Sequence, residues 1–409
     1  MSKLRIAWVI NSVTSGGIGT VCKYAAERLA RLPEWDATVV SINEFPSKRT
    51  DAMSGVHYVT LGLEDKAPQR FLAWLKDNPQ HYVITSDVPT IEPAFQYFPK
   101  ETLHIIQLHD SFTRIVNVAI RNSRYVDGIV CVAHHITDYL RKPLNNVNYR
   151  GVLETVHNGA AFPLAPIRTI YSGPLRLIYM GSMDPIKGIL DTVPILQKLR
   201  KIDVPVTLKI VGGHHELLER RFKQKRLESL VTWIGRVPHE ECYKLASASD
   251  LFLMLSRKEA FGMVTIEAMS MGCVPIAYNV TSGNIEIIEN EKSGILLPIG
   301  DFESCANAIN SLHKNREHLL RLSEGAMHRS RTQFNETMMA DRLCGVLKQV
   351  QKNAEIHKSE RKLGLPYEVS SRFQTKYSFY QLISPTIRNW LRNRIGAYPR
   401  LCLWFLKHW

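Results

Sequence analysis

Two glutamates separated by seven residues are the side chains in this sequence best suited to hold a polar ligand. The stretch Ser249–Ile276 reads SDLFLMLSRKEAFGMVTIEAMSMGCVPI and contains Glu259 and Glu267. Gly262 lets the backbone turn sharply into a helix, whose first N–H groups can face an anion. A carboxylate just before such a helix does not help to bind a bare phosphate, but it accepts hydrogen bonds from hydroxyl groups. The stretch therefore predicts a ligand that carries hydroxyls as well as phosphates.

Cationic and glycine-rich turns follow other strands expected in the same half of the chain. Lys187-Gly188 lies shortly after the expected strand Leu175–Met180, and a lysine there supplies a point charge for a phosphate. The remaining turns of this kind contain Gly212-Gly213, Arg236 and Ser282-Gly283. A solvated surface lysine is the alternative for Lys187 taken alone. The recurrence of such turns at several strand ends favours a binding site along one edge of the sheet.

A glycine-rich turn also follows the first expected strand of the chain. Ser15–Thr20 reads SGGIGT and opens a helix, so its backbone can approach a phosphate or a sugar closely. The spacing is not G-x-G-x-x-G, and no acidic residue clearly ends the second strand, so the dinucleotide fingerprint is incomplete. A simple tight turn remains the alternative.

His109-Asp110 lies at the carboxyl end of another expected strand, where open parallel sheets place their ligands. His109 could hydrogen-bond a substrate hydroxyl, and Asp110 could orient or charge-stabilise the imidazole. A histidine that merely caps the next helix is the alternative.

Alternating strands and helices must position these side chains. The expected strands of the first half are Leu4–Asn11, Ala37–Ile42, Val56–Leu61, Tyr82–Ser86, Leu103–Leu108, Gly128–Val132 and Leu153–Val156. Those of the second half are Leu175–Met180, Val206–Val211, Val231–Ile234, Leu251–Leu255 and Val274–Ala277. Amphipathic helical patterns lie between them, at Tyr24–Leu32, Arg70–Leu75, Phe112–Tyr125, Ile136–Leu140, Ile189–Leu199, Glu240–Ala248, Val264–Met271, Ile285–Glu289 and Phe302–Leu312. This alternation indicates parallel sheets covered on both faces. The proline-rich segment Ala161–Pro174 reads as a linker, so two doubly wound α/β domains with a cleft between them are expected.

The composition is that of a soluble, basic, two-domain protein. A chain of 409 residues exceeds one typical core, and a formal net charge of +14 favours anionic partners. The seven cysteines are scattered without a C-x-x-C pair, which argues for a reducing compartment and against a zinc site. No signal-peptide pattern and no spanning apolar run is evident, so a cytoplasmic location is expected. Nucleic acid is not an expected partner, because no reader motif accompanies the charge.

Several motifs in fixed order resemble those of one enzyme family. They are Val156-His157-Asn158-Gly159, Gly181 with Lys187-Gly188, Ile234-Gly235-Arg236-Val237-Pro238, and Ser256–Gly262 with Glu267-Ala268-Met269. Together they are similar to the family 4 retaining glycosyltransferases of the GT-B fold (glycosyl transferases group 1), over about residues 5–345. The resemblance implies two Rossmann-like domains facing across a cleft. Residues 1–165 would form the acceptor-side domain, 166–350 the nucleotide-sugar domain, and 351–409 crossover helices with a basic aromatic tail.

The resemblance also implies roles for individual residues. Lys187 would bind the donor diphosphate, Glu259 would contact hydroxyls of the transferred sugar, and His109 would lie beside the anomeric centre. Glu267 would bind the ribose hydroxyls, and Arg236 would lie in a loop against the base. Backbone groups would hold phosphate or sugar oxygens at Phe261, Gly262, Met263 and Val264, and those of Gly17, Ile18 and Gly19 would lie near the diphosphate.

The chain departs from the family pattern in three places. Ser182 occupies a substrate-binding position where the family usually has an arginine, which removes one cation from the diphosphate site; Arg257 or another nearby base is the candidate replacement. Ala260 replaces a glycine, and Ala160 follows Asn158-Gly159 in place of the usual aliphatic residue. The first departure bears most directly on donor affinity.

The chemistry implied is metal-independent transfer of a glycosyl group. Departure of the diphosphate builds negative charge, which Lys187 and the helix N-terminus after Phe261 would stabilise. The sequence contains no Asp-x-Asp, so neither a metal nor another cofactor is expected.

The C-terminal tail combines basic and aromatic residues. Residues 369–409 contain no Asp or Glu, and basic side chains alternate there with Trp390, Trp404, Phe405 and Trp409. Such a pattern suits a helix at a membrane interface, whereas packing on the N-terminal domain is the alternative. The sequence favours packing for Phe373–Ile383 and contact with an anionic membrane surface for Pro385–Trp409.

The resulting prediction is a retaining glycosyltransferase peripheral to the inner face of the cell membrane. It would move a sugar from a UDP- or GDP-linked donor to a hydroxyl of a glycan or lipid-linked acceptor, in cell-surface polysaccharide biosynthesis. A nicotinamide oxidoreductase is disfavoured by the incomplete fingerprint. A non-catalytic subunit that binds a sugar nucleotide or a glycan remains the alternative, and Ser182 motivates it.

Overall fold

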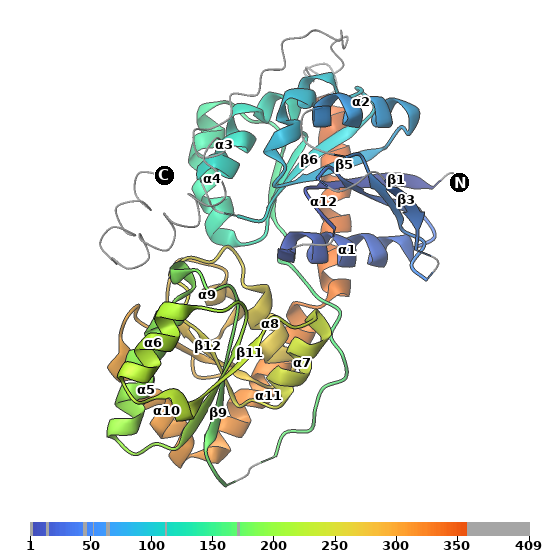
Figure 1. Cartoon of the computed structure of the whole chain (residues 1–409). Helices are drawn as coiled ribbons and strands as arrows, with labels where there is room; N and C mark the ends of the chain where they lie inside the picture. Colours follow the sequence, from blue (N-terminus) through green and yellow to red (C-terminus); the bar gives the residue numbers. More distant parts are fainter. Residues whose placement is uncertain are drawn as a thin grey trace. The chain divides into compact units, whose positions relative to one another are not determined.

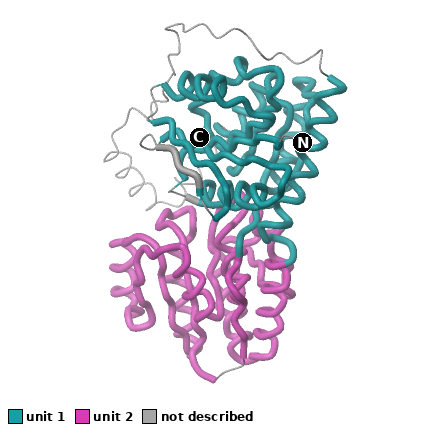
Figure 2. Tube along the Cα trace, turned by 90° about the vertical axis from the view of Figure 1, so that its right-hand side faces the viewer, with its two compact units in different colours: residues 1–161, 332–373 teal, residues 162–331, 374–409 magenta. Residues whose placement is uncertain are grey.

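The protein consists of two compact units, each built around one β-sheet. A computed structural model describes residues 3–13, 16–43, 47–51, 53–62, 66–110, 113–169 and 172–357 (Figure 1). Unit 1 contains the residues up to Ala161 and returns at Thr332, while Phe162–Arg331 form unit 2 (Figure 2). None of the described helices combines the length and the apolar character that spanning a membrane requires.

Unit 1 holds an eight-stranded sheet in the order β3-β4-β2-β1-β5-β6-β7-β8. Its strands are β1 (Leu4–Ile10), β2 (Trp35–Ser41), β3 (Ser47–Thr50), β4 (His57–Thr60), β5 (Tyr82–Ser86), β6 (Leu103–Leu108), β7 (Gly128–Cys131) and β8 (Val152–Thr155). All neighbours are parallel except β3, which pairs antiparallel with β4 at the edge. The strand order reverses between β1 and β5, so the loops after these two strands flank the switch point where such sheets bind ligands.

Helices cover this sheet and include one from the far end of the described chain. They are α1 (Gly16–Ala30), α2 (Ala67–Asp77), α3 (Thr113–Arg121), α4 (His134–Asn146) and α12 (Glu336–Ile356), together with the 3-10 segments η2 (Pro89–Tyr97) and η3 (Ser123–Tyr125). Helix α12, orange in Figure 1, packs on α1, β6 and β8. Strand β5 is buried at all five positions, as expected of a central strand covered on both faces.

Unit 2 holds a six-stranded, wholly parallel sheet in the order β11-β10-β9-β12-β13-β14. Its strands are β9 (Leu175–Met180), β10 (Val206–Val211), β11 (Val231–Gly235), β12 (Leu251–Met254), β13 (Val274–Tyr278) and β14 (Ile295–Leu297). Here the strand order reverses between β9 and β12. The loops after these two strands therefore meet at the switch point of this sheet.

The helices of unit 2 bury their apolar faces on both sides of its sheet. They are α5 (Thr192–Lys201), α6 (Glu216–Gln224), α7 (His239–Ser247), α8 (Met263–Ser270), α9 (Asn284–Ile287), α10 (Phe302–Lys314) and α11 (Arg316–Gln333), with 3-10 segments η4 (Pro185–Lys187), η5 (Ile189–Asp191) and η6 (Glu228–Leu230). Leu177, Leu253 and Ile276 lie at the centre of the core with no exposed surface.

The expected architecture of two doubly wound units is confirmed, and the element boundaries differ in detail. The prediction placed residues 166–350 in the second domain, whereas α12 belongs to unit 1, where its apolar face is buried. Helix α1 begins at Gly16, so the glycine-rich turn forms the first turn of the helix. The sequence prediction omitted β3, β14, α6, α11 and α12. The tail, including Phe373–Ile383 and Pro385–Trp409, lies outside the described residues.

Candidate functional site

A lysine and a glutamate meet at the switch point of unit 2. Lys187 follows β9 and Glu259 follows β12, and Lys187 Nζ donates a 2.7 Å hydrogen bond to Glu259 Oε2. The side chains retain 32% and 16% of their exposure, so both can reach a ligand in the loops. The two residues are 72 positions apart in the sequence, and the reversal of strand order brings them together.

The loop that carries Lys187 is fixed by a glycine that no other residue could replace without strain. Gly188 has φ +72°, and a Cβ at this position would lie 1.9 Å from the carbonyl oxygen of Leu255. The loop after β9 therefore lies directly against the end of β12. Asp184 caps the short η4 turn by accepting the N–H of Ile186. These contacts set the direction of the Lys187 side chain.

Arg257 lies beside this loop and is bound to the scaffold through one of its nitrogens. Its Nη2 donates to both carboxylate oxygens of the buried Asp191, at 3.0 and 2.8 Å. Tyr278 donates a further 2.7 Å hydrogen bond to Asp191. The Arg257 side chain keeps 32% of its exposure, and its part in replacing the missing arginine stays a prediction. Ser182 is exposed, and Tyr179 donates to its carbonyl oxygen at 2.7 Å.

Helix α8 presents its N-terminus at the same edge of the sheet. Gly262 is its N-cap with φ +112°, and no side chain caps the helix. A Cβ on Gly262 would lie 2.5 Å from Asn284 Oδ1. The N–H groups of Thr265 and Ile266 return to the Gly262 carbonyl, so those of Met263 and Val264 point out of the first turn. Phe261 before the turn is buried.

Asn284 adds a polar group that the sequence interpretation did not single out. It is fully buried, and its Oδ1 accepts a 2.9 Å hydrogen bond from Thr265. Its Nδ2 has no hydrogen-bond partner among the described residues. A buried amide donor next to the α8 N-terminus is suited to an acceptor on a ligand.

Glu267 lies inside α8 and pairs with a histidine that the sequence interpretation also missed. Its side chain is 9% exposed, and Oε1 lies 2.8 Å from Nε2 of His239 at the start of α7. The hydrogen bond to Glu267 raises the pKa of His239, and burial opposes this effect. A hydrogen-bonded histidine–carboxylate pair therefore occupies the position expected to bind ribose hydroxyls.

Arg236 follows β11 and is exposed. Gly235, the last residue of β11, directly precedes Arg236, and its carbonyl accepts the N–H of Gly212 at 2.9 Å. Gly213 lies near the Arg236 side chain: a Cβ on Gly213 would be 4.0 Å from Arg236 Nε. Arg236 is thus near the loop after β10, as expected of neighbouring strand ends. Its contact with a base stays a prediction.

His109 lies in unit 1, after β6, and is enclosed by protein. It is 9% exposed, and burial lowers the pKa of its imidazole to about 3. Its Nε2 has no hydrogen-bond partner among the described residues. The imidazole is therefore neutral at physiological pH and retains an unsatisfied nitrogen.

Asp87, directly after β5, is the acidic partner of His109. Its Oδ1 accepts the backbone N–H of His109 at 3.1 Å, and Asn11 after β1 donates to its carbonyl oxygen at 3.2 Å. Burial and, less strongly, the nearby Asp110 raise the pKa of the carboxyl group to about 8. Its φ of +47° is uncommon for a residue with a side chain. Asp87 thus joins the two loops at the switch point of unit 1.

The glycines of the first loop take a different place from the one expected. Gly17, Ile18 and Gly19 lie in the first turn of α1, with Gly17 exposed and Gly19 buried. A Cβ on Gly19 would lie 2.7 Å from the carbonyl oxygen of Ser12. Gly19 therefore permits close packing of the helix on the end of β1, while a role near a diphosphate stays a prediction.

The two units divide the expected site residues between them. Unit 2 brings together Lys187 with Glu259, and it carries Ser182, Arg236, Phe261–Val264 and Glu267; unit 1 carries Gly17–Gly19 and His109. Within unit 2, the described His, Cys, Asp and Glu side chains form no group of three that could hold a metal ion.

Comparison with protein families identifies unit 2 more closely. Residues 164–329 match the family model described as Glycosyl transferases group 1. The chain is 26% identical over 188 residues to glycogen synthase of Mycobacterium tuberculosis, which covers 45% of each protein. It is 30% identical over 160 residues to N-acetyl-alpha-D-glucosaminyl L-malate synthase of Bacillus anthracis, covering 39% of the chain and 41% of that protein. The chain thus matches less than half the length of these curated relatives.

Solved structures extend the likeness of fold to both units. Sucrose-phosphate synthase from Thermosynechococcus elongatus matches with a TM-score of 0.71 at 17% identity, covering 86% of this chain and 100% of that one. The Anabaena protein Alr3699/HepE in complex with UDP and glucose matches with a TM-score of 0.66, also at 17% identity, covering 85% and 100%. The two-sheet α/β architecture is that of the GT-B fold, and the expected fold class is confirmed.

Proposed function

We propose that this chain, whose second unit carries a glycosyl transferases group 1 domain, is a retaining glycosyltransferase that uses a nucleotide-diphosphate sugar. The observation that carries the proposal is the arrangement at the switch point of unit 2. A cation, Lys187, meets a carboxylate, Glu259, at the strand ends beside the uncapped N-terminus of α8. Such a site offers charge to a diphosphate and hydrogen-bond acceptors to sugar hydroxyls.

Lys187 and the first turn of α8 are assigned to the leaving group. Cleavage of the glycosyl–phosphate bond increases negative charge on the departing diphosphate, and fixed positive groups stabilise that charge. The N–H groups of Met263 and Val264, with the Asn284 amide, add neutral donors. Because Ser182 supplies no cation and Arg257 is bound to Asp191, Lys187 carries most of this stabilisation.

The two carboxylates are assigned to hydroxyl groups of the donor. Glu259 accepts hydrogen bonds from the transferred sugar, and its bond to Lys187 orients the carboxylate for that role. Glu267 accepts hydrogen bonds from the ribose hydroxyls. The donor either displaces His239 from Glu267 or shares the carboxylate with it. Arg236 is assigned to the nucleotide base.

His109, which belongs to unit 1, is assigned to the sugar that is transferred. Its neutral imidazole can exchange one hydrogen bond with a sugar hydroxyl, and Asp87 holds the backbone of His109 in place. Gly17, Ile18 and Gly19 are assigned to the donor diphosphate on the same side. No metal or other cofactor takes part in this proposal.

The acceptor is proposed to be a hydroxyl of a glycan or of a lipid-linked intermediate in cell-surface polysaccharide synthesis. The basic aromatic segment Pro385–Trp409 is proposed to hold the enzyme at an anionic membrane on the cytoplasmic side. The likeness to a GDP-mannose:cellobiosyl-diphosphopolyprenol alpha-mannosyltransferase of Xanthomonas oryzae pv. oryzae, 26% identical over 140 residues, supports such an acceptor. It covers 33% of the chain and 37% of that protein. Equal flotation of the full chain and a 1–384 truncation with anionic vesicles would argue against the membrane contact.

The experiment that tests the function measures nucleotide release from a panel of UDP- and GDP-sugars, with lipid extract as acceptor. We expect one donor to be turned over, and Lys187→Ala and Glu259→Gln to lower kcat by about 10²–10³-fold. Lys198→Ala is the matched control, because it breaks another lysine–glutamate pair of unit 2, with Glu303, at the surface. A wild-type protein that binds a donor but releases no nucleotide would support the non-catalytic binding subunit instead.

A further inference from the structure

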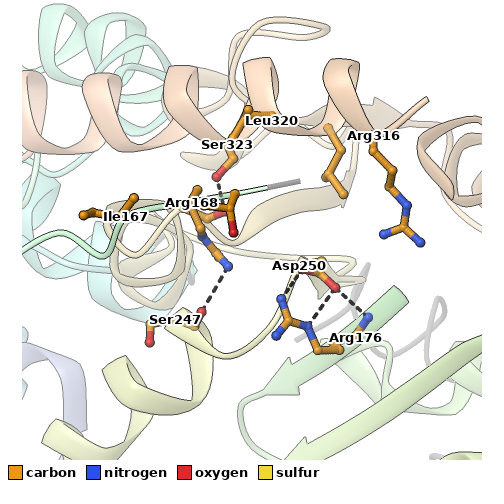
Figure 3. A pocket seen from close by; sticks show the side chains of 11 residues that line it. Ile167, Arg168, Arg176, Ser247, Asp250, Arg316, Leu320 and Ser323 are labelled. Carbon is orange, nitrogen blue, oxygen red and sulfur yellow. Dashed lines mark hydrogen bonds and ion pairs between the residues drawn. The ribbon is translucent and has the colours of Figure 1, made fainter. Parts of the chain in front are cut away.

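A cavity in unit 2 lies at the opposite ends of the strands from the candidate donor loops. It has a volume of about 290 Å³ and is lined by Ile167, Arg168, Thr169, Arg176, Ser247, Asp250, Gly272, Arg316, Leu319, Leu320 and Ser323 (Figure 3). Arg176, Asp250 and Gly272 lie at or before the amino ends of β9, β12 and β13. Lys187 and Glu259 follow the carboxyl ends of β9 and β12. The cavity is therefore separate from the candidate donor site.

Positive charge predominates among the residues that line this cavity. Three of them are arginines, and one, Asp250, is acidic. Asp250 is 6% exposed and already bound by Arg176, whose Nη2 lies 2.7 Å from Oδ1. Three guanidinium groups around one paired carboxylate leave the lining with a net positive charge. Such a lining attracts an anion.

The other two arginines donate hydrogen bonds to backbone carbonyl oxygens of unit 2. Arg168 donates to the carbonyls of Ser247 and Ser249 at 3.0 and 2.7 Å. Arg316 Nη2 donates to the carbonyl of Gly173 at 2.6 Å. In Figure 3 the Arg168 and Arg176 side chains lie below helix α11, which contributes Arg316, Leu320 and Ser323.

The start of a helix adds to the positive potential here. Helix α11 begins at Arg316, so its first two turns, at the positive end of the helix dipole, line the cavity.

We propose that this cavity binds a phosphate monoester of a small sugar. Arginines are the side chains that hold phosphate oxygens with paired N–H groups, and the hydroxyls of Ser247, Ser323 and Thr169 suit sugar hydroxyls. Leu319 and Leu320 offer an apolar surface for the sugar ring. The volume lies at the low end of the range of ligand pockets, so it fits a sugar phosphate better than a complete sugar nucleotide. Because the cavity is remote from the donor loops, its ligand is distinct from the donor assigned to those loops.

The test is calorimetric titration of the full chain with glucose 6-phosphate, with inorganic phosphate as a second probe. We expect the ester to bind, and Arg316→Gln and Leu320→Trp each to weaken binding by about tenfold or more. Leu320→Trp fills the cavity without changing its charge, so it separates occupancy from electrostatics. Arg321→Gln is the matched control, because Arg321 lies on the same helix, is exposed and does not line the cavity.

A donor-site variant makes the outcome decisive. Lys187→Ala should bind the ester as tightly as the wild type, since Lys187 lies at the other end of the sheet. Loss of binding in Lys187→Ala, or unchanged binding in a folded Leu320→Trp protein, would overturn the proposal. Absence of binding at millimolar ester would overturn it too. Equal affinity for inorganic phosphate and the ester would contradict the role given to the sugar.

Discussion

The role proposed for unit 1 involves a carboxyl group that is buried against the backbone of His109. Asp87 keeps its proton up to about pH 8 because burial penalises its ionised form. A protonated carboxyl can donate as well as accept, while His109 is neutral throughout this range. Neither side chain therefore adds charge at the place that the proposal gives to the reacting sugar.

Asp87 also predicts a pH dependence of stability. In the unfolded chain Asp87 loses its proton near its ordinary value of 3.8, whereas in the folded protein it does so near 8. The folded state thus binds more protons between these values, and stability falls as the pH rises across this window. Asp87→Asn removes this loss and keeps both the acceptor for His109 and a residue that tolerates positive φ. Because the folded wild type keeps a proton that its unfolded chain has lost, we expect the variant to gain about 1.4 kcal/mol relative to wild type for each pH unit between pH 4 and pH 8.

Calorimetry of the full chain at several pH values would measure this gain in the transition of unit 1. The variant should also transfer sugar more slowly at every pH, because it cannot act as a carboxylic acid toward the ligand. A wild type and variant with parallel stability profiles would contradict the burial of a protonated Asp87.

His239 predicts a second pH dependence of stability, which comes from an ion pair and not from the burial of a neutral acid. Its pKa is raised above 6.5 by Glu267, so the pair stabilises the fold fully below that value and less as the pH rises through the raised pKa. The histidine side chain is 42% exposed, so the contribution is at most about 1 kcal/mol. His239→Gln should lower the melting temperature of unit 2 by about 2–4 °C at pH 6 and hardly at pH 9. Tyr139→Phe changes an exposed side chain of unit 1. As a control, it should leave the melting temperature of unit 2 unchanged.

The residues named from the sequence and those it missed differ in a physical way. Lys187 and Glu259 follow strands of unit 2, and Glu267 lies in the helix after the second of these loops, so their types and spacing are readable in the sequence. The contacts of Asp87 and His239 are made with residues that the fold brings to them from elsewhere in the chain. No local sequence pattern encodes such contacts. An acidic residue directly after the strand Tyr82–Ser86 was the one available signal for Asp87.

At the scale of elements, apolar periodicity identified the central strands and failed at the margins. β5 and β13 are buried at every position, and their apolar runs are plain in the sequence. β14 has only three residues, too few to show a period, and α6 has only three apolar residues among five charged ones. Helix α1 begins eight residues before the expected Tyr24, because its glycines permit close packing where propensity argues against a helix.

The approach of the two loops in unit 2 can be tested through glycine. Gly188 and Gly300 have nearly the same backbone angle, φ +72° and +75°, but their surroundings differ. A Cβ on Gly300 would meet no described atom within 4 Å, whereas a Cβ on Gly188 would meet the backbone of Leu255. Gly300→Ala should therefore cost only the conformational penalty, about 1–2 kcal/mol. Gly188→Ala should cost about 2 kcal/mol more, since the loop must move away from Leu255.

Moving that loop also moves Lys187, so Gly188→Ala should reduce donor binding at temperatures where the protein stays folded. Denaturation curves and donor titrations of the two variants measure the two effects separately. Equal destabilisation by both alanines would show that the loop after β9 does not press on the end of β12.

At the scale of the whole molecule, the chain leaves unit 1 at Ala161 and returns to it at Thr332. The return is fixed by backbone hydrogen bonds between Ala160 and the segment at Phe334 and Glu336, at 3.0 and 3.1 Å. Gly159 allows this approach, because a Cβ there would lie 2.3 Å from the carbonyl oxygen of Asn335. The sequence could not assign α12 to either unit, since its apolar face would suit any exposed sheet.

This crossover predicts which fragments fold by themselves. Helix α12 buries an apolar face in unit 1, made of Met339, Ala340, Leu343, Val346, Leu347, Val350 and Ala354. Burying each large apolar side chain contributes about 1.5–3 kcal/mol, so loss of the helix removes as much free energy as a whole domain has, about 5–15 kcal/mol. Residues 1–161 should therefore lack a cooperative melting transition.

Joining residues 1–161 to 332–357 through a short Gly/Ser linker should restore that transition, because Ala160 and Phe334 are hydrogen-bonded neighbours. Residues 162–331, which hold a complete parallel sheet and core, should fold without any addition. Near-UV circular dichroism and calorimetry of the three fragments distinguish these cases. Changing Val350 to Asp in the linked fragment supplies the control, since its side chain packs on Gly128 of β7, 2.7 Å from where a Cβ would lie. A cooperative transition in residues 1–161 alone would mean that the sheet of unit 1 is stable without α12, and that the helix is an accessory to the fold instead of part of its core.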